Sequence, residues 1–255
     1  MPLARDRCIC LRKVEYSETS QILTLFAREH GIIRAIAKGA HRRTKAGASK
    51  FDGGIDLLDS GEAVFTHASE KNLGTLCEWS LRDGHREVHK HLRAMYLGQY
   101  AAELISTLIE ENDPHVDLFD RFESILTELP TSRTEEAFLA FELDLFREAG
   151  YLPQLTDCVN CDQPAADRAW FSPSRGGLIC RNCEGVAPDR IPIDPRLVRI
   201  AQTIMNLPRA NGSPQRLPHL TRHQTDPLNK LLAEHIEHTL SRRLRLTGYV
   251  LANGR

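Results

Sequence analysis

Long apolar runs are what this 255-residue chain most clearly lacks. No stretch approaches the roughly 20 apolar residues that cross a bilayer, and the N-terminal segment MPLARDRCICLRK has no apolar core of a signal peptide. We therefore expect a cytoplasmic protein. Thiols stay reduced in that compartment, so the seven cysteines are predicted to be free or bound to metal.

Recognisable catalytic motifs are also missing. The sequence contains no G-x-x-x-x-G-K-[ST] loop, no G-x-G-x-x-G after a predicted strand, no G-x-S-x-G elbow and no H-E-x-x-H. His85 and His89 in GHREVHKH could share a helical face, but the reversed order of Glu and His and the lack of a third ligand favour an exposed helix start. No carboxylates form a recognisable acid–base pair. We therefore predict no catalytic residues and no enzymatic activity.

The net charge of −1, taken alone, does not indicate a polyanionic partner. The charges are, however, unevenly distributed along the chain. Residues 1–80 carry 12 Lys and Arg against 10 Asp and Glu, residues 81–150 carry 7 against 15, and residues 184–255 carry 11 against 6. Both ends of the chain are therefore basic, and the middle is acidic.

The densest positive charge lies between positions 28 and 50, where Glu29 is the only acid. The cations of this segment are Arg28, Arg34, Lys38, Arg42, Arg43, Lys45 and Lys50. A positive stripe of this kind can follow a phosphate backbone. Its second half belongs to GAHRRTKAGASKFDGG, which has too much Gly, Ala and charge for a core element and is predicted to be a loop.

Four of the seven cysteines form two C-x-x-C pairs separated by eighteen residues: Cys158, Cys161, Cys180 and Cys183. This is the spacing of a tetrahedral zinc site. Two disulfides, or a redox C-x-x-C, would each leave part of the pattern unexplained. Four thiolates leave no position for water, so the predicted zinc ion is structural and contributes folding free energy on the order of 10 kcal/mol. The other cysteines are predicted to be buried strand residues: Cys8, Cys10 and Cys77.

Short apolar and β-branched runs alternate with glycines from position 7 to about position 80. Five or six strands of this length, among them GIDLLDS and EAVFTHA, predict a small barrel. In the run IIRAIAK (residues 32–38), alternation places Arg34 and Lys38 on the same face.

The apolar period becomes helical after Gly84. Helices are predicted over about 88–108, 117–129, 132–150, 196–207 and 226–246. Their aromatic stripes are predicted to be core. The cysteine unit lies inside this helical part of the chain and not at a terminus.

Four stretches of the chain carry one combined motif. Residues 14–42, VEYSETSQILTLFAREHGIIRAIAKGAHR, hold a Tyr, a Glu two residues on, and two aliphatic strands before Lys-Gly-Ala. FELDLFREAGYLPQLTDCVNC ends a helix in Gly-Tyr-x-Pro before the first cysteine pair, FSPSRGGLICRNC holds the second pair, and HIEHTLSRRLRLTGYV is a C-terminal helix. Together they resemble the RecO family of bacterial recombination mediators, although His41 stands where that family usually has Arg.

The resemblance implies an α+β multidomain fold. An N-terminal OB-fold β-barrel, the nucleic-acid-binding domain, would cover residues 1–80. An all-helical domain would cover residues 81–255, interrupted by a four-cysteine zinc-ribbon module at 155–188. The DNA contacts expected on this fold are Arg34, Lys38, Arg42, Arg43, Lys45 and Lys50.

The resemblance also implies a role as a mediator of DNA repair and homologous recombination. Such a protein binds single- and double-stranded DNA, anneals complementary strands and, with RecR, helps load recombinase onto DNA coated with single-strand-binding protein. The implied partners are DNA, RecR and the C-terminal tail of single-strand-binding protein, with no membrane, and the implied location is cytoplasmic and nucleoid-associated. Arg121 and Arg133 are candidates for a cationic pocket that receives the acidic tail.

Two other classes of protein remain open. In a zinc-ribbon adaptor, such as a transcription-associated protein, the ribbon itself would touch nucleic acid. The span from 151 to 183 has three arginines against three aspartates, which favours a scaffold over a basic reading surface, and Trp170 is predicted to pack behind the metal. A metal-dependent hydrolase or transferase would need an open coordination position, which four cysteines do not leave.

Overall fold

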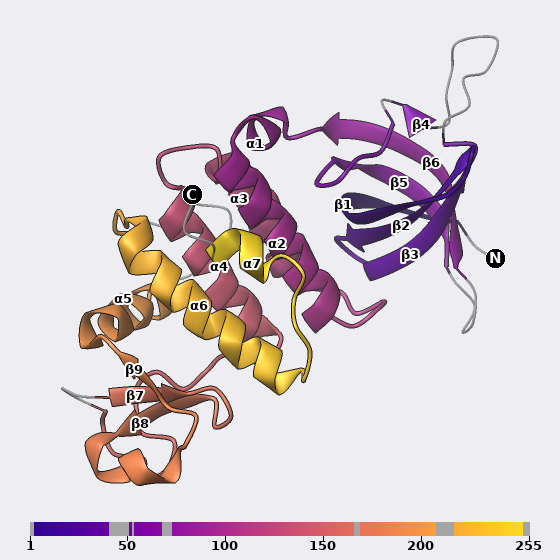
Figure 1. The fold of residues 1–255 in the computed structure, drawn as a ribbon. Helices are drawn as coiled ribbons and strands as arrows, with labels where there is room; N and C mark the ends of the chain where they lie inside the picture. Colours follow the sequence, from indigo (N-terminus) through magenta and orange to yellow (C-terminus); the bar gives the residue numbers. More distant parts are fainter. Residues whose placement is uncertain are drawn as a thin grey trace. The chain divides into compact units, whose positions relative to one another are not determined.

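The chain divides into two compact units, Met1–Thr131 and Ser132–Arg255. The computed structural model (Figure 1) describes residues 3–40, 51–52, 54–67, 73–165, 169–207 and 217–251. Strands change to helices inside the first unit. The predicted domain limits, 1–80 for the OB-fold domain and 81–255 for the helical domain, remain a prediction.

The first unit begins with a closed barrel. Its strands are β1 (Leu3–Ser17), β2 (Ser20–Ala27), β3 (Gly31–Lys38), β4 (Phe51–Asp52), β5 (Ser60–Thr66) and β6 (Gly74–Asp83). The order β3-β2-β1-β5-β6-β4 is closed by a parallel pairing of β3 with β6, so that five strands complete the ring and the short β4 lies beside β6. This OB-like arrangement (Figure 1) confirms the predicted N-terminal barrel.

Strand β1 is long enough to pair with two neighbours. Its first half pairs with β5 and its second half with β2, and the register shifts between Cys10 and Arg12. Cys8 and Cys10 are buried in the barrel core, as predicted, whereas Cys77 is only partly buried. A Cβ added to Gly61 would lie 2.5 Å from the ring of Trp79, so a glycine lets β5 approach this buried indole.

Three helices follow the barrel in the same unit: α1 (Arg86–Lys90), α2 (Leu92–Leu108) and α3 (Val116–Glu128). Helix α3 contacts the barrel through Phe119, whose ring centroid lies 5.5 Å from that of Phe26. Beside this contact the Arg28 guanidinium donates to both carboxylate oxygens of Asp120, at 2.8 and 2.7 Å. That hydrogen bonding lowers the pKa of Asp120. Arg28 is therefore an internal partner of α3 and is not available as part of the basic stripe.

The start of β3 is positioned by the loop after α2. Gly31 has φ +71°, and a Cβ there would lie 2.2 Å from the carbonyl oxygen of Asp113. The backbone N–H of Asn112 donates to the carbonyl oxygen of Ile32 at 3.0 Å. A residue with a side chain at position 31 would therefore force β3 away from this loop.

In its described residues, the second unit combines four α-helices with a small sheet. Its elements are α4 (Thr134–Glu148), β7 (Ala169–Ser172), β8 (Gly177–Cys180), the 3₁₀ helix η1 (Arg181–Val186), β9 (Ile191–Ile193), α5 (Pro195–Met205), α6 (Arg222–Thr239) and α7 (Thr247–Leu251). The sheet has the order β8-β7-β9 and is antiparallel. The hydroxyl of Thr225 on α6 donates to Oε2 of Glu135 on α4 at 2.9 Å, which joins the first turns of these two helices.

Three predicted features differ from the structure: one strand, the bounds of one helix and the exposure of one residue. Residues 55–59, predicted as a strand, form a turn in which Leu58 has φ +69°. The last long helix begins earlier than predicted, because Thr221 and Gln224 form a capping box, and it ends at Thr239. His85, predicted to be exposed, is buried with its Nε2 2.8 Å from the Ser60 hydroxyl, and burial lowers its pKa.

Among the described residues, no helix is both long and apolar enough to span a membrane.

Candidate metal centre and nucleic-acid face

The first cysteine pair lies on a tight turn in the second unit. The N–H of Asp162 donates to the carbonyl of Cys158 at 2.9 Å, and the N–H of Cys158 donates to the carbonyl of Gln163 at 2.9 Å. Asp162 has φ +57°, which turns the chain sharply after Cys161. Both thiols of the pair are thereby directed to one side.

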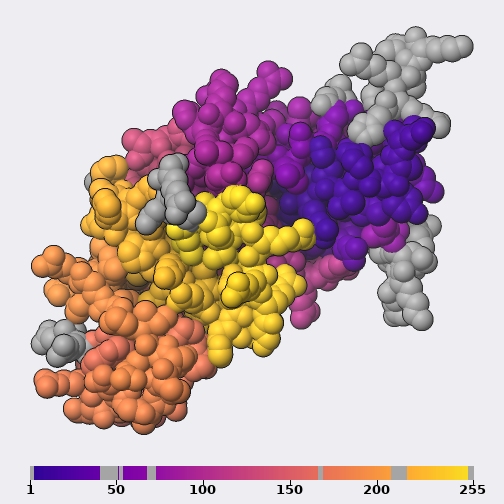
Figure 2. Space-filling view, viewed as in Figure 1, coloured from indigo at the N-terminus to yellow at the C-terminus, as the bar shows by residue number. Residues whose placement is uncertain are grey.

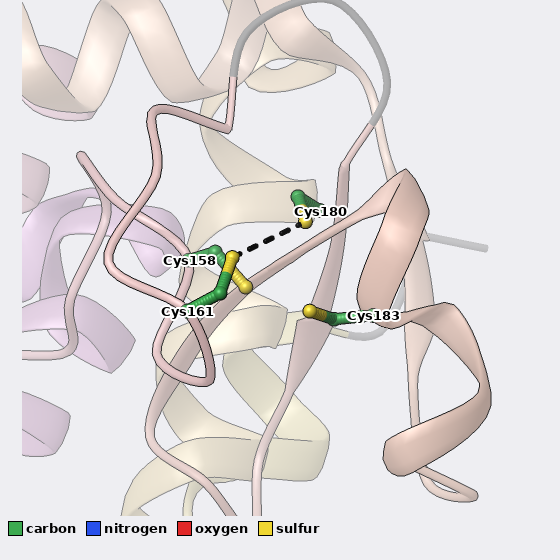
Figure 3. A group of neighbouring side chains, drawn as sticks. All are labelled: Cys158, Cys161, Cys180 and Cys183. Atoms are coloured by element: carbon green, nitrogen blue, oxygen red, sulfur yellow. Dashed lines mark hydrogen bonds between the residues drawn. The ribbon is translucent and has the colours of Figure 1, made fainter.

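The second cysteine pair lies where a strand becomes a 3₁₀ helix. Cys180 ends β8 and Cys183 lies in η1. The N–H of Val159 donates to the carbonyl of Leu178 at 2.9 Å, which ties the first turn to β8. Side chains from the two segments converge on one point (Figure 3).

The four sulfur atoms have the spacing of a metal site. All lie within 4.8 Å of one another, and Sγ of Cys161 is 3.7 Å from Sγ of Cys180. Zn–S bonds of about 2.3 Å give a tetrahedron whose sulfur–sulfur edges are about 3.8 Å. A disulfide needs about 2.05 Å. The cluster can therefore hold a tetrahedral metal ion, and its geometry does not match two disulfides.

Local hydrogen bonds prepare one of these thiols for a cation. Burial works to raise the pKa of Cys158, but backbone donors at Cys180, Asn160 and Cys161 outweigh it and bring that pKa to about 6. The side-chain amide of Asn160 also donates to Sγ of Cys183 at 3.4 Å. Donors of this kind orient sulfur ligands toward a shared metal ion.

Apolar side chains pack behind the sulfur atoms. Ile179 and Ala187 are buried in the cluster, and Val159 and Trp170 pack against it. The prediction that Trp170 packs behind the metal site is therefore confirmed. In the space-filling view (Figure 2) the module belongs to the orange lobe of the surface. Within the same unit, the ring centroids of Phe171 on β7 and His235 on α6 lie 6.0 Å apart.

Strand β3 presents the two described cations of the predicted DNA-binding set. Arg34 and Lys38 are both exposed, while Ile33, Ala35 and Ala37 lie in the barrel core, so the predicted alternation is confirmed. Arg34 lies 3.6 Å from Glu111, and both side chains of this pair are 53% exposed. A pair this exposed is weak and open to exchange with a phosphate. The remaining predicted contacts lie outside the described residues: Arg42, Arg43, Lys45 and Lys50.

The same outer face continues onto β2 and β1, which the sequence-based prediction did not include. Arg12, Thr24 and Arg34 form one row across the three strands, because Thr24 pairs with both arginines. Val14, Ile22 and Ile36 form the next row by the same register. The signal was present in the alternation of residues 12–16, RKVEY, but pairing register is needed to place these residues beside β3.

Arg133, one of the two candidates for an acidic-tail pocket, is engaged within its own unit. Its Nε lies 3.3 Å from Oε1 of Glu136, and it donates to the carbonyl of Leu217 at 2.8 Å. These contacts fix the start of α4 to the segment before α6. Arg133 therefore has a structural role at this junction.

An OB-like barrel, a helical C-terminal half and a four-cysteine cluster within that half together define a multidomain protein that combines an OB-like barrel with a candidate metal module. Two family profiles match it. The one described as "Recombination protein O N terminal" matches residues 1–85, and the one described as "Recombination protein O C terminal" matches residues 89–247. The chain belongs to the RecO family of DNA repair proteins.

Curated relatives agree with this assignment. The chain is 35% identical to the DNA repair protein RecO of Rhodopirellula baltica over 179 residues, which cover 69% of this chain and 65% of that protein, just under two thirds of its length. It is 30% identical to RecO of Alkaliphilus metalliredigens, with 80% of this chain and 81% of the relative covered. The match to RecO of Pelotomaculum thermopropionicum, at 27% identity, covers 96% of this chain and 92% of the relative.

Proposed function

We propose that this protein binds single- and double-stranded DNA on the outer face of its barrel and anneals complementary strands during recombinational repair. The observation that carries the proposal is the row of cations across β1–β3, with Arg12 and Arg34 on either side of Thr24 and Lys38 further along β3. Barrels of this topology use this face and its adjoining loops for oligonucleotides. Family membership supports the same role.

Annealing requires no bond-breaking chemistry. Two polyanions repel each other, and cations that replace their counterions lower this repulsion. The contact must leave the Watson–Crick edges of the bases free to pair. Side chains that hold phosphates along a shallow sheet face, without enclosing the strand, meet both requirements.

The cysteine cluster is proposed to hold one structural Zn²⁺. Cys158, Cys161, Cys180 and Cys183 would supply the four ligands, and the spacing of their sulfur atoms supports zinc over a larger or octahedral ion. A bound zinc ion joins the turn at 158–161 to β8 and η1. The catalytic role considered for a hydrolase would require a vacant position that this ligand set does not provide.

The partners proposed for this protein rest on its family. They are RecR, with which it would help load recombinase, and the acidic C-terminal tail of single-strand-binding protein. A cytoplasmic, nucleoid-associated location is proposed with them.

Replacing both described cations of β3, in the variant Arg34→Ala/Lys38→Ala, is expected to weaken binding to single- and double-stranded oligonucleotides alike. If about five cations contact single-stranded phosphates, log affinity against log salt falls with a slope of about −3.5, and removing two brings it to about −2. Fluorescence anisotropy with labelled oligonucleotides at several salt concentrations measures both quantities. Annealing of complementary strands, naked or coated with single-strand-binding protein, is expected to slow in the same variant.

The matched control is Arg82→Ala, because Arg82 is 55% exposed on β6 and pairs with Glu62. This variant removes a cation from the barrel but not from the β1–β3 face. It is therefore expected to leave the slope of log affinity against log salt, and the annealing rate, unchanged. A wild-type slope near zero, or equal effects of the two variants, would contradict the proposed face.

A further inference from the structure

An exposed aromatic side chain lies at the end of the β1–β3 face. Tyr16 is 65% exposed and Val14 is 40% exposed, which makes them two of the large apolar residues on the surface of the described chain. Tyr16 falls where the register of β1 against β2 shifts, between the pairs Glu15–Gln21 and Ser17–Ser20. A bulge of this kind leaves the extra residue outside the regular ladder and redirects its side chain.

The apolar residues beside Tyr16 form a row between cations. Val14 pairs with Ile22, which pairs with Ile36, so these three side chains lie side by side across β1, β2 and β3. With strands about 4.8 Å apart, the row spans about 10 Å. Arg12 and Arg34 lie in the next row on one side, and Lys38, paired with Ser20, lies on the other.

Helices cover only part of this outer face. Ile9, Phe26 and Ile32 form a row nearer the other end of the same strands, where they are buried and Phe26 contacts Phe119 of α3. Ile22 and Ile36 remain only half-buried. The barrel core does not use them either, since it is built from residues of the opposite parity, such as Leu23, Leu25 and Ala35.

We propose that Tyr16 and the row Val14–Ile22–Ile36 form a base-stacking surface that makes this face bind single-stranded DNA more tightly than duplex. This inference rests on the proposed DNA-binding function and specifies its substrate. A duplex offers phosphates to the flanking cations but keeps its bases stacked inside. A single strand offers phosphates and unstacked bases together, which matches a face with both cations and apolar side chains.

The test is the variant Tyr16→Ala in the full-length protein, measured by anisotropy with a labelled oligothymidine and with a labelled duplex. Loss of one stacked base is expected to weaken single-strand binding about 5- to 150-fold. Duplex affinity and the salt slope are expected to remain those of the wild type, because no cation is removed. Tyr16→Phe keeps the ring and is expected to bind like the wild type.

Tyr249→Ala is the matched control, since Tyr249 is 60% exposed but belongs to the second unit. Equal single-strand affinity in Tyr16→Ala and wild type, while Arg34→Ala/Lys38→Ala weakens binding, would overturn the stacking surface and leave the DNA-binding proposal intact. Equal losses on single strand and duplex would also overturn it, because stacking cannot act on a duplex. Failure of the wild type to bind either oligonucleotide would instead remove the proposed function itself.

Discussion

Replacing Cys180 with serine is expected to lower the melting temperature of the protein by more than about 10 °C while leaving DNA affinity close to that of the wild type. A structural zinc site contributes on the order of 10 kcal/mol, and each kcal/mol moves the melting temperature of a chain of this size by about 2–4 °C. Cys180 would supply one of the four ligands of the proposed zinc site and ends β8, so its loss is expected to weaken both the site and the attachment of η1.

Calorimetry and bound-zinc analysis of the purified variant measure the two effects. Bound zinc is expected to fall from one per chain to well below one. DNA affinity should persist because the proposed DNA-binding residues lie in the first unit, whereas the cluster lies in the second.

The control for this experiment is Cys77→Ser, which changes a partly buried thiol on β6 outside the cluster. It is expected to keep full zinc and to melt near the wild type. Unchanged melting of Cys180→Ser would rule out a structural metal. Selective loss of DNA binding with the melting temperature preserved would mean that the cysteine module itself reads nucleic acid, as in a zinc-ribbon adaptor.

Replacing Glu142 with glutamine is expected to stabilise the second unit at neutral and alkaline pH. Glu142 on α4 is fully buried, and burial raises its pKa well above the ordinary value of 4.5. Within the described residues, neither of its carboxylate oxygens has a hydrogen-bond partner. In this position the carboxyl group must either keep its proton or place a negative charge in the core. At high pH each alternative lowers the free energy of unfolding.

A second unsatisfied polar group lies on the helix that α4 contacts. Asn229 on α6 is fully buried, and both polar atoms of its side chain are unpaired among the described residues. Glu142 follows Glu135 by two turns of α4, and Asn229 follows Thr225 by about one turn of α6. Because Glu135 and Thr225 are hydrogen-bonded, Glu142 and Asn229 lie along the same helix–helix contact.

The pH dependence follows from the direction of the shift. The folded protein keeps a proton that the unfolded chain releases above about pH 4.5, so the free energy of unfolding falls as pH rises from that value toward the folded pKa. Each pH unit in this window costs about 1.4 kcal/mol. Glu142→Gln removes this loss, so its advantage over wild type is expected to be near zero at pH 4.5 and to exceed about 1.4 kcal/mol at pH 8.

Urea unfolding of both proteins at pH 5, 6.5 and 8 measures this difference, and any effect of pH on the cysteine cluster cancels between them. Glu136→Gln is the matched control, since Glu136 is equally buried on α4 but accepts from the N–H of Leu220 and lies 3.3 Å from Nε of Arg133. Glu136→Gln is expected to destabilise by about 1.5–3 kcal/mol. An advantage of Glu142→Gln that shrinks as pH rises would contradict the assignment.

Spacing along the chain was enough to predict the cysteine cluster and much of the secondary structure. Two cysteines separated by two residues can place both sulfur atoms on one side of a tight turn. The span of eighteen residues is long enough to fold back and bring the second pair opposite the first, which completes a four-cysteine site. The alternation of apolar and charged residues at 32–38 likewise predicted which side chains of β3 are in the core and which are on the surface. Side chains of a strand alternate between its two faces whichever strands pair with it. Helix α6 began earlier than predicted because its capping box lies outside the apolar stripe.

The sequence by itself determined the four-cysteine cluster, the barrel followed by helices, and the cations of β3. The tertiary structure decided which of those features are exposed and what lies beside them. In the sequence, Arg28 is indistinguishable from the other cations of its segment. In the structure, it is hydrogen-bonded to Asp120 on α3. Tyr16, Ile22 and Ile36 become one surface only through the pairing of β1, β2 and β3. Short-range periodicity is a property of the chain, whereas register and burial depend on contacts between residues distant in sequence.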